Sequence, residues 1–206
     1  MTPSLAAVHD DMVAAAADPR LAPRVDAIRA RFVQRVGPFA PSDPWFEERS
    51  GAFWDRVLVD AGVREALLAA PPPTFGADHR EVLGALARAQ RGLFEVRPSE
   101  ATVDVVCVAT GAAFRLAASD DAAHAMSRGG EGGWIDGWVI ATREGVALLP
   151  GLLVHPAEAT DPMRELVKSG LAFDDLLDAL LAMRHRLASR SRMRARQVYR
   201  AEALPR

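Results

Sequence analysis

The sequence predicts an α+β protein in which helices from both ends of the chain frame a central, small antiparallel β meander or half-barrel. Three observations support this class. Apolar residues recur at the helical spacing of three and four in the first part of the chain and again after residue 155, whereas they alternate in short runs in between. Half of the 206 residues are apolar, which is enough for a sizeable core.

We therefore divide the chain into three regions. Residues 1–92 are predicted to form an N-terminal helical region, residues 93–154 an antiparallel β unit, and residues 155–206 the C-terminal helices with a basic tail. We expect the three regions to fold as one compact domain.

The N-terminal region contains three predicted helices. The segment RLAPRVDAIRARFVQRVG carries one apolar stripe before a Gly-Pro pair ends it, formed by Leu21, Val25, Ile28, Phe32 and Val36. The second helix begins in SDPWFEERSG, where Asp43 is a suitable cap and Pro44 suits the first helical position. The third helix follows a PPP spacer, has Asp78 and Glu81 in a capping arrangement, and ends at Gly92.

The central region consists of short runs with strand-like composition. They are LFEVR, TVDVVCV, AAFRLAA, WIDGWVIAT and GVALLPGLLV. Because short turns separate most of them, we expect antiparallel pairing. A Gly-rich loop over residues 119–133 is predicted to be mobile, and Pro150 predicts an edge or a bulge in the last strand.

The C-terminal region returns to the helical period after Pro156, which suits a first helical turn. The last helix is expected to start near Phe173. Its buried stripe is predicted to consist of Phe173, Leu176, Leu177, Leu180, Met183 and Leu187.

No metal-binding or cofactor motif is present in the sequence, and we predict neither a metal nor a cofactor. The zinc motif HExxH is absent, and His79 and Glu81 are two residues apart, so they face different directions on a helix. Cys107 lies in the apolar run VVCV, where a thiol acts as a small hydrophobic group. The loop sequence GGEGG lacks the lysine and the spacing of a phosphate-binding loop.

His155 and Glu158 are the candidates for a small enzyme's acid–base pair, because they lie where a strand runs into a helix. The competing interpretation is a helix entry, in which Pro156 starts the helix and Glu158 accepts hydrogen bonds from first-turn amides. We favour the structural interpretation.

Trp134 and Trp138 are four residues apart on one predicted strand, so they belong to the same face. Exposed, they would form a platform for a partner; buried, they would anchor the sheet to the helices, which we favour. A homodimer is predicted from the aromatic residues that crowd one short helix, whose apolar area exceeds what a core easily covers: Trp45, Phe46, Phe53 and Trp54.

The beginning of the chain does not match a signal peptide. It lacks a basic segment, and His9, Asp10 and Asp11 interrupt its apolar stretch. No apolar run approaches the roughly 18 residues of a membrane span, and the single Cys107 excludes an internal disulfide framework. We therefore expect a cytoplasmic protein that does not bind a membrane.

The strongest functional signal is the basic tail. Residues 183–206 hold eight arginines and one glutamate, whereas the rest of the chain holds 17 basic and 26 acidic residues. As a helix, the tail would continue the stripe of the last helix with Leu187, Ser191 and Val198. As an extended strand, it would place four arginines on one side: Arg190, Arg192, Arg194 and Arg196.

These four arginines are the candidate nucleic-acid-binding residues, because arginine donates two hydrogen bonds at once to phosphate. Alternatively, the arginines pair with the protein's own acidic residues, for example Asp174, Asp175, Asp178 or Glu165. We favour a non-catalytic interaction or adaptor protein whose unidentified protein partner contacts the β unit and neighbouring helices. A nucleic-acid-associated protein that uses the tail is the first alternative.

Overall fold

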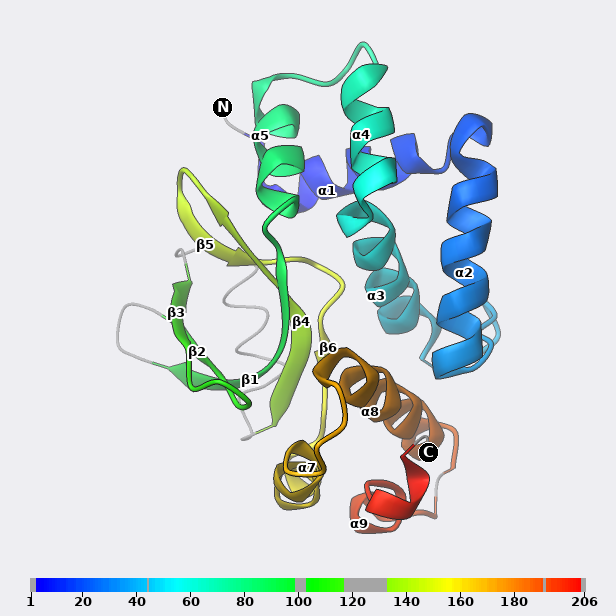
Figure 1. The fold of residues 1–206 in the computed structure, drawn as a ribbon, viewed down its shortest axis with the longest axis vertical. Coiled ribbons are helices and arrows are strands. Elements are labelled where there is room, and N and C mark those ends of the chain that lie inside the picture. The colour runs from blue at the N-terminus through cyan, green and yellow to red at the C-terminus, as the bar shows by residue number, and fades with distance from the viewer. Residues whose placement is uncertain (1–2, 44, 99–102, 117–132, 191, 205–206) are drawn as a thin grey trace.

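The computed structural model describes residues 3–43, 45–98, 103–116, 133–190 and 192–204. The α+β class is confirmed, because helices from both ends of the chain pack beside a six-stranded sheet (Figure 1). Pro44 and most of the predicted Gly-rich loop at 119–133 lie outside the described residues. None of the helices in the described part of the chain is both long and apolar enough to cross a membrane.

The N-terminal region folds into more helices than the sequence predicts. They are α1 (Leu5–Ala16), the 3-10 turn η1 (Pro19–Leu21), α2 (Ala22–Val36), α3 (Phe46–Val59), α4 (Ala61–Ala69) and α5 (Ala77–Leu86). The predicted stripe of α2 is confirmed for Val25, Ile28, Phe32 and Val36, which are buried, whereas Leu21 belongs to η1 and is only partly buried. Helix α1 is not among the predicted helices. It buries Val8, Met12 and Ala16, and this narrow stripe is hard to recognise in the sequence because alanines surround it.

Asp60 separates α3 from α4. Its backbone is extended at φ −66° and ψ 126°, and its carboxylate accepts hydrogen bonds from the backbone N–H groups of Gly62 and Val63 at 3.1 and 3.2 Å. A side-chain acceptor for the first free amides is what starts a helix at this position.

The strands close into a small barrel. They are β1 (Gln90–Pro98), β2 (Val103–Cys107), β3 (Ala113–Leu116), β4 (Trp134–Thr142), β5 (Gly145–Leu148) and β6 (Leu153–Val154). Their order is β1-β2-β3-β5-β4-β6, and β1 pairs with β4 as well as with β2, so the sheet curls back on itself. Phe94, Val105, Cys107, Ile135 and Leu148 belong to one buried cluster of this barrel.

The sheet is mixed, whereas the sequence predicts a wholly antiparallel one. β3 and β5 pair in parallel at Leu116 and Val146. The pair is parallel because β1, β2 and β3 alternate in direction, as do β1, β4 and β5, so β3 and β5 both run in the direction of β1. The predicted last strand, GVALLPGLLV, is divided into β5 and β6, because Pro150 and Gly151 form a turn between them in place of the predicted edge or bulge.

Helix α3 packs closely against that turn. A Cβ on Gly151 would lie 2.3 Å from the carbonyl oxygen of Gly51, so neither position has room for a side chain facing the other. The buried carboxylate of Asp55 accepts a hydrogen bond from the Gly151 N–H at 3.0 Å and shares one with His9 Nε2 at 2.7 Å. Helices α1 and α3 are thereby fixed to the barrel.

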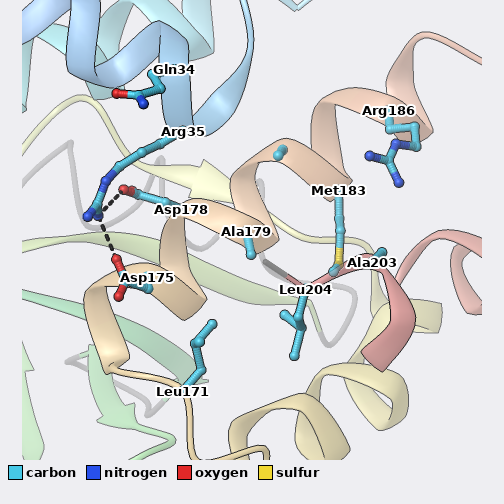
Figure 2. Close-up of a pocket in the computed structure, with 11 residues that line it drawn as sticks. Gln34, Arg35, Leu171, Asp175, Asp178, Ala179, Met183, Arg186, Ala203 and Leu204 are labelled. Atoms are coloured by element: carbon cyan, nitrogen blue, oxygen red, sulfur yellow. Dashed lines mark hydrogen bonds and ion pairs between the residues drawn. The ribbon is translucent and has the colours of Figure 1, made fainter. Parts of the chain in front are cut away.

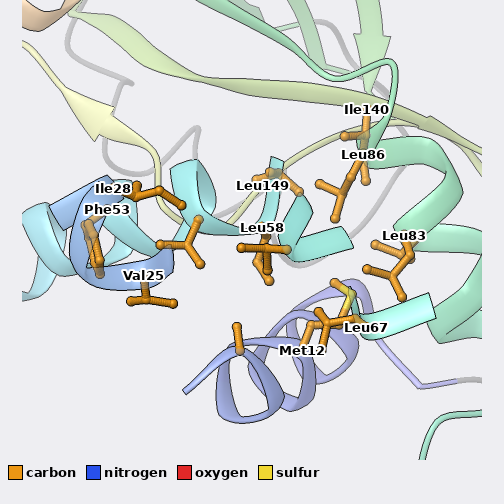
Figure 3. Packing of buried hydrophobic residues seen from close by; sticks show 14 of the residues in the cluster. Met12, Val25, Ile28, Phe53, Leu58, Leu67, Leu83, Leu86, Ile140 and Leu149 are labelled. Atoms are coloured by element: carbon orange, nitrogen blue, oxygen red, sulfur yellow. The ribbon is translucent and has the colours of Figure 1, made fainter. Parts of the chain in front are cut away.

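The C-terminal region consists of η2 (Ala157–Ala159), α7 (Thr160–Val167), α8 (Phe173–Ala188), α9 (Ala195–Val198) and η3 (Ala201–Ala203). The central part of the predicted α8 stripe is confirmed, since Leu176, Leu177, Leu180 and Met183 are buried. On its other side α8 contributes Leu181 to the large cluster under the N-terminal helices, part of which Figure 3 shows. α8 therefore packs against both helical groups.

Candidate functional site

A buried ion network lies where the barrel, α8 and the N-terminal helices meet. Arg91 of β1 binds Asp136 of β4 through two hydrogen bonds, from Nε at 3.1 Å and Nη2 at 2.8 Å. Its remaining guanidinium nitrogen, Nη1, donates a hydrogen bond to Asp178 of α8 at 2.7 Å. The three side chains are at most 7% exposed, so the ions hold the elements together away from water.

Two further arginines complete the network from α2 and α3. Arg56 binds both carboxylate oxygens of Asp178, and Arg35 binds Asp178 at 3.0 Å and Asp175 at 2.8 Å. Burial acts to raise the pKa of Asp178, but the hydrogen bonds and charges of Arg56 and Arg91 outweigh it and lower the pKa to about 2. The network thus joins three arginines to three aspartates.

A groove opens beside this network between α2, α8 and the end of the chain (Figure 2). Its volume is about 650 Å³. The larger side chains that line it are Gln34, Arg35, Leu171, Asp175, Asp178, Met183, Arg186 and Leu204. Arg35 binds both Asp175 and Asp178, as Figure 2 shows, whereas Arg186 has no ion pair or hydrogen bond with any described residue.

His155 and Glu158 are not brought together in a cavity. His155 is 0% exposed, and its Nδ1 shares a hydrogen bond with the Tyr199 hydroxyl at 2.8 Å. Burial lowers the pKa of His155 to about 3, assisted by the charges of Arg184 and Arg91, so the ring is neutral at physiological pH. Glu158 is exposed on η2. This geometry does not support an acid–base pair.

The two tryptophans lie in different parts of the core. Trp134 is 3% exposed and packs among residues of α7, α8 and α9, with the Arg164 guanidinium 5.5 Å from its ring. Trp138 is half-buried against the cluster of the N-terminal helices. This burial fits the anchoring interpretation better than a partner platform.

The crowded aromatic residues near α3 are also covered. Trp45 and Phe53 are 6% and 0% exposed, and Phe46 and Trp54 are half-buried. Among the described residues, Leu68 is the large apolar side chain that stands exposed. The apolar area on which the homodimer prediction depends is therefore small.

The arginines of the basic tail lie on a short folded segment, not on a continuation of α8. α8 ends at Ala188. The single turn α9 buries Ala195 and Val198, and Tyr199, which follows the turn, is buried as well. The predicted helical or fully extended tail is thus replaced by a turn that its apolar residues fix to α8 and η2. Figure 1 shows α9 close to α8.

The remaining side chains of this segment face water and form what we call the arginine surface: Arg190, Arg192, Arg194, Arg196 and Arg200. Within the described part of the chain, none of them has a carboxylate partner. The acids proposed as their partners are engaged elsewhere: Asp175 and Asp178 bind Arg35, and Glu165 binds Lys168 at 2.8 Å. Asp174 is exposed.

Sequence reasoning found the arginine surface but missed the ion network. A signal was present, because Asp136 interrupts the apolar strand WIDGWVI and Asp178 interrupts the apolar run LLDALL. A charge inside a buried run needs a partner. The described residues contain no group of three or more potential metal ligands.

No family model, curated protein or solved structure matches the chain.

Proposed function

We propose that this chain is a non-catalytic interaction protein that binds nucleic acid through the arginine surface. One observation carries the proposal. The arginine surface is exposed and has no carboxylate partner among the described residues, although the rest of the chain is rich in acids.

Phosphate is the partner that this chemistry fits best. The guanidinium group donates two parallel hydrogen bonds and is weakly hydrated, so it exchanges water for phosphate oxygens at low cost. Each arginine that neutralises a phosphate also releases condensed counterions. Because Ala195, Val198 and Tyr199 anchor the segment, the arginines need less ordering when they bind.

The barrel is a weaker candidate for the same role. Small barrels can bind oligonucleotides on an exposed strand face with cationic and aromatic side chains. Here the cations of that face are already paired, Arg115 with Asp104 at 3.0 Å and Arg97 with Glu95 at 2.7 Å. The arginine surface is therefore favoured over the strands.

The proposal also places the protein in the cytoplasm.

The test is a fluorescence-anisotropy titration of labelled duplex and single-stranded oligonucleotides at several salt concentrations. Four phosphate contacts from Arg190, Arg192, Arg194 and Arg196 correspond to a log–log slope of about −3.6 on duplex DNA, from about −0.9 per contact. The variant with all four replaced by serine is expected to lose most of this slope and most of its affinity.

The matched control replaces four exposed arginines elsewhere by serine, which changes the net charge equally: Arg31, Arg80, Arg88 and Arg97. It is expected to retain most of the binding. The proposal is wrong if no oligonucleotide binds in a salt-dependent way, or if the control loses as much affinity as the tail variant. Tighter binding to polyglutamate than to either oligonucleotide would identify an acidic protein as the partner instead.

A further inference from the structure

We infer that the groove between α2, α8 and the C-terminal segment binds a small organic monoanion with an apolar body, such as a medium-chain carboxylate. This site is separate from the arginine surface. Its ligand class follows from the size of the groove, its apolar lining and the balance of charge around it.

The size fits a small molecule. The groove has a volume of about 650 Å³, and small-molecule sites usually occupy about 300–1,000 Å³. Apolar side chains from three places line it: Leu171 before α8, Ala179 and Met183 on α8, and Leu204 at the end of the chain. Such a wall favours an alkyl or aromatic body over a strongly hydrated one.

The charge of the ligand follows from the pairing of the lining groups. Asp178 is bound by Arg35, Arg56 and Arg91, and the half-exposed Asp175 is bound by Arg35. With Asp136, the network contains as many aspartates as arginines, so it presents no net charge to the groove when all are ionised. Both acids that line the groove therefore already have their cation.

Among the charged residues that line the groove, Arg186 is the one that these ion pairs do not neutralise. It is exposed at the edge of the groove and has no ion pair or hydrogen bond with another described residue. One guanidinium matches a single carboxylate, whereas a doubly charged phosphate calls for more than one cation.

The test uses octanoate with the full chain, followed by amide chemical shifts in NMR titrations. Octan-1-ol and octylammonium serve as the neutral and cationic probes of the same length. Saturable shifts from octanoate are expected around Gln34, Arg186 and Leu204, with the alcohol binding about tenfold more weakly and the ammonium weaker still.

The variants separate the charge from the apolar wall. Arg186→Gln is expected to weaken octanoate binding about tenfold and to make octanoate and octanol equal. The matched control Arg190→Gln removes the same charge outside the groove and is expected to bind octanoate like the natural chain. Ala203→Leu, which adds bulk to the lining, is expected to weaken both probes.

Three results would overturn the inference: no saturable octanoate binding, equal binding of octanoate and octanol to the natural chain, or equal losses in Arg186→Gln and Arg190→Gln. None of these measurements uses an oligonucleotide. The outcome therefore stands whether or not the arginine surface binds nucleic acid.

Discussion

At the scale of single residues, Asp178 is the side chain on which the architecture depends most. It lies on α8 and binds arginines from α2, α3 and β1. A buried charge is stable only when it is paired, and here one carboxylate partners three guanidinium groups. Its substitution is therefore expected to affect the whole fold and not only α8.

Asp178→Asn should lower the free energy of unfolding by about 3 kcal/mol, because it leaves Arg56 and Arg91 short of an anionic partner in a buried position. Urea denaturation measures this. The matched control is Asp175→Asn, whose side chain is 40% exposed and binds Arg35 alone, so its cost is at most about 1 kcal/mol. Equal losses in the two variants would contradict the central role of Asp178.

The same carboxyl predicts how stability depends on acid. Its pKa is lowered from 3.8 to about 2, so its contribution is fully present above pH 3.8 and disappears as the pH falls through the folded-state value. That contribution is about 2 kcal/mol. Unfolding free energies between pH 5 and pH 2 should therefore converge for the natural chain and Asp178→Asn. A constant difference over this range would show that Asp178 does not titrate in this way.

At the scale of elements, the sequence predicts what depends on local spacing and misses what depends on long-range pairing. The stripe of α2 can be recognised because polar residues flank it, and that of α8 because its apolar residues recur at spacings of three and four. The barrel closes through β1 and β4, where Gln90 faces Val139, and no local pattern specifies that contact. The ion network was missed for the same reason, since Arg91, Asp136 and Asp178 are far apart in the sequence. The arginine surface was found because its residues are sequential.

The attachment of α9 gives a prediction at this scale. Tyr199 is 2% exposed and shares a hydrogen bond with His155, which is itself buried. Tyr199→Phe keeps the ring but leaves His155 Nδ1 without that partner, at a cost of about 1–2 kcal/mol. Hydrogen exchange should become faster in residues 195–204 than in β4. The control Ser189→Ala removes an exposed hydroxyl contact to the His185 carbonyl and should leave exchange in α9 unchanged. Equal acceleration in α9 and β4 would contradict a local anchor.

At the scale of the whole molecule, positive charge is concentrated at the end of a chain whose remainder is acidic. Two arrangements satisfy such a sequence: the tail binds the body through ion pairs, or the body uses its acids internally and leaves the tail unpaired. The structure has the second arrangement, because Asp175, Asp178 and Glu165 bind other cations. The arginines of the tail are then not required for stability.

This arrangement predicts that replacing Arg190, Arg192, Arg194 and Arg196 together by serine leaves the melting temperature within about 2 °C of the natural chain. The anchoring residues Ala195, Val198 and Tyr199 are kept, and no described carboxylate loses a partner. If the four arginines instead held the acidic body, at up to about 1 kcal/mol each, their loss would lower the melting temperature by about 8–16 °C for a chain of this size. Differential scanning calorimetry at about 20 mM and 300 mM salt distinguishes the two arrangements, since only tail–body ion pairs would make the difference between the variants shrink with salt.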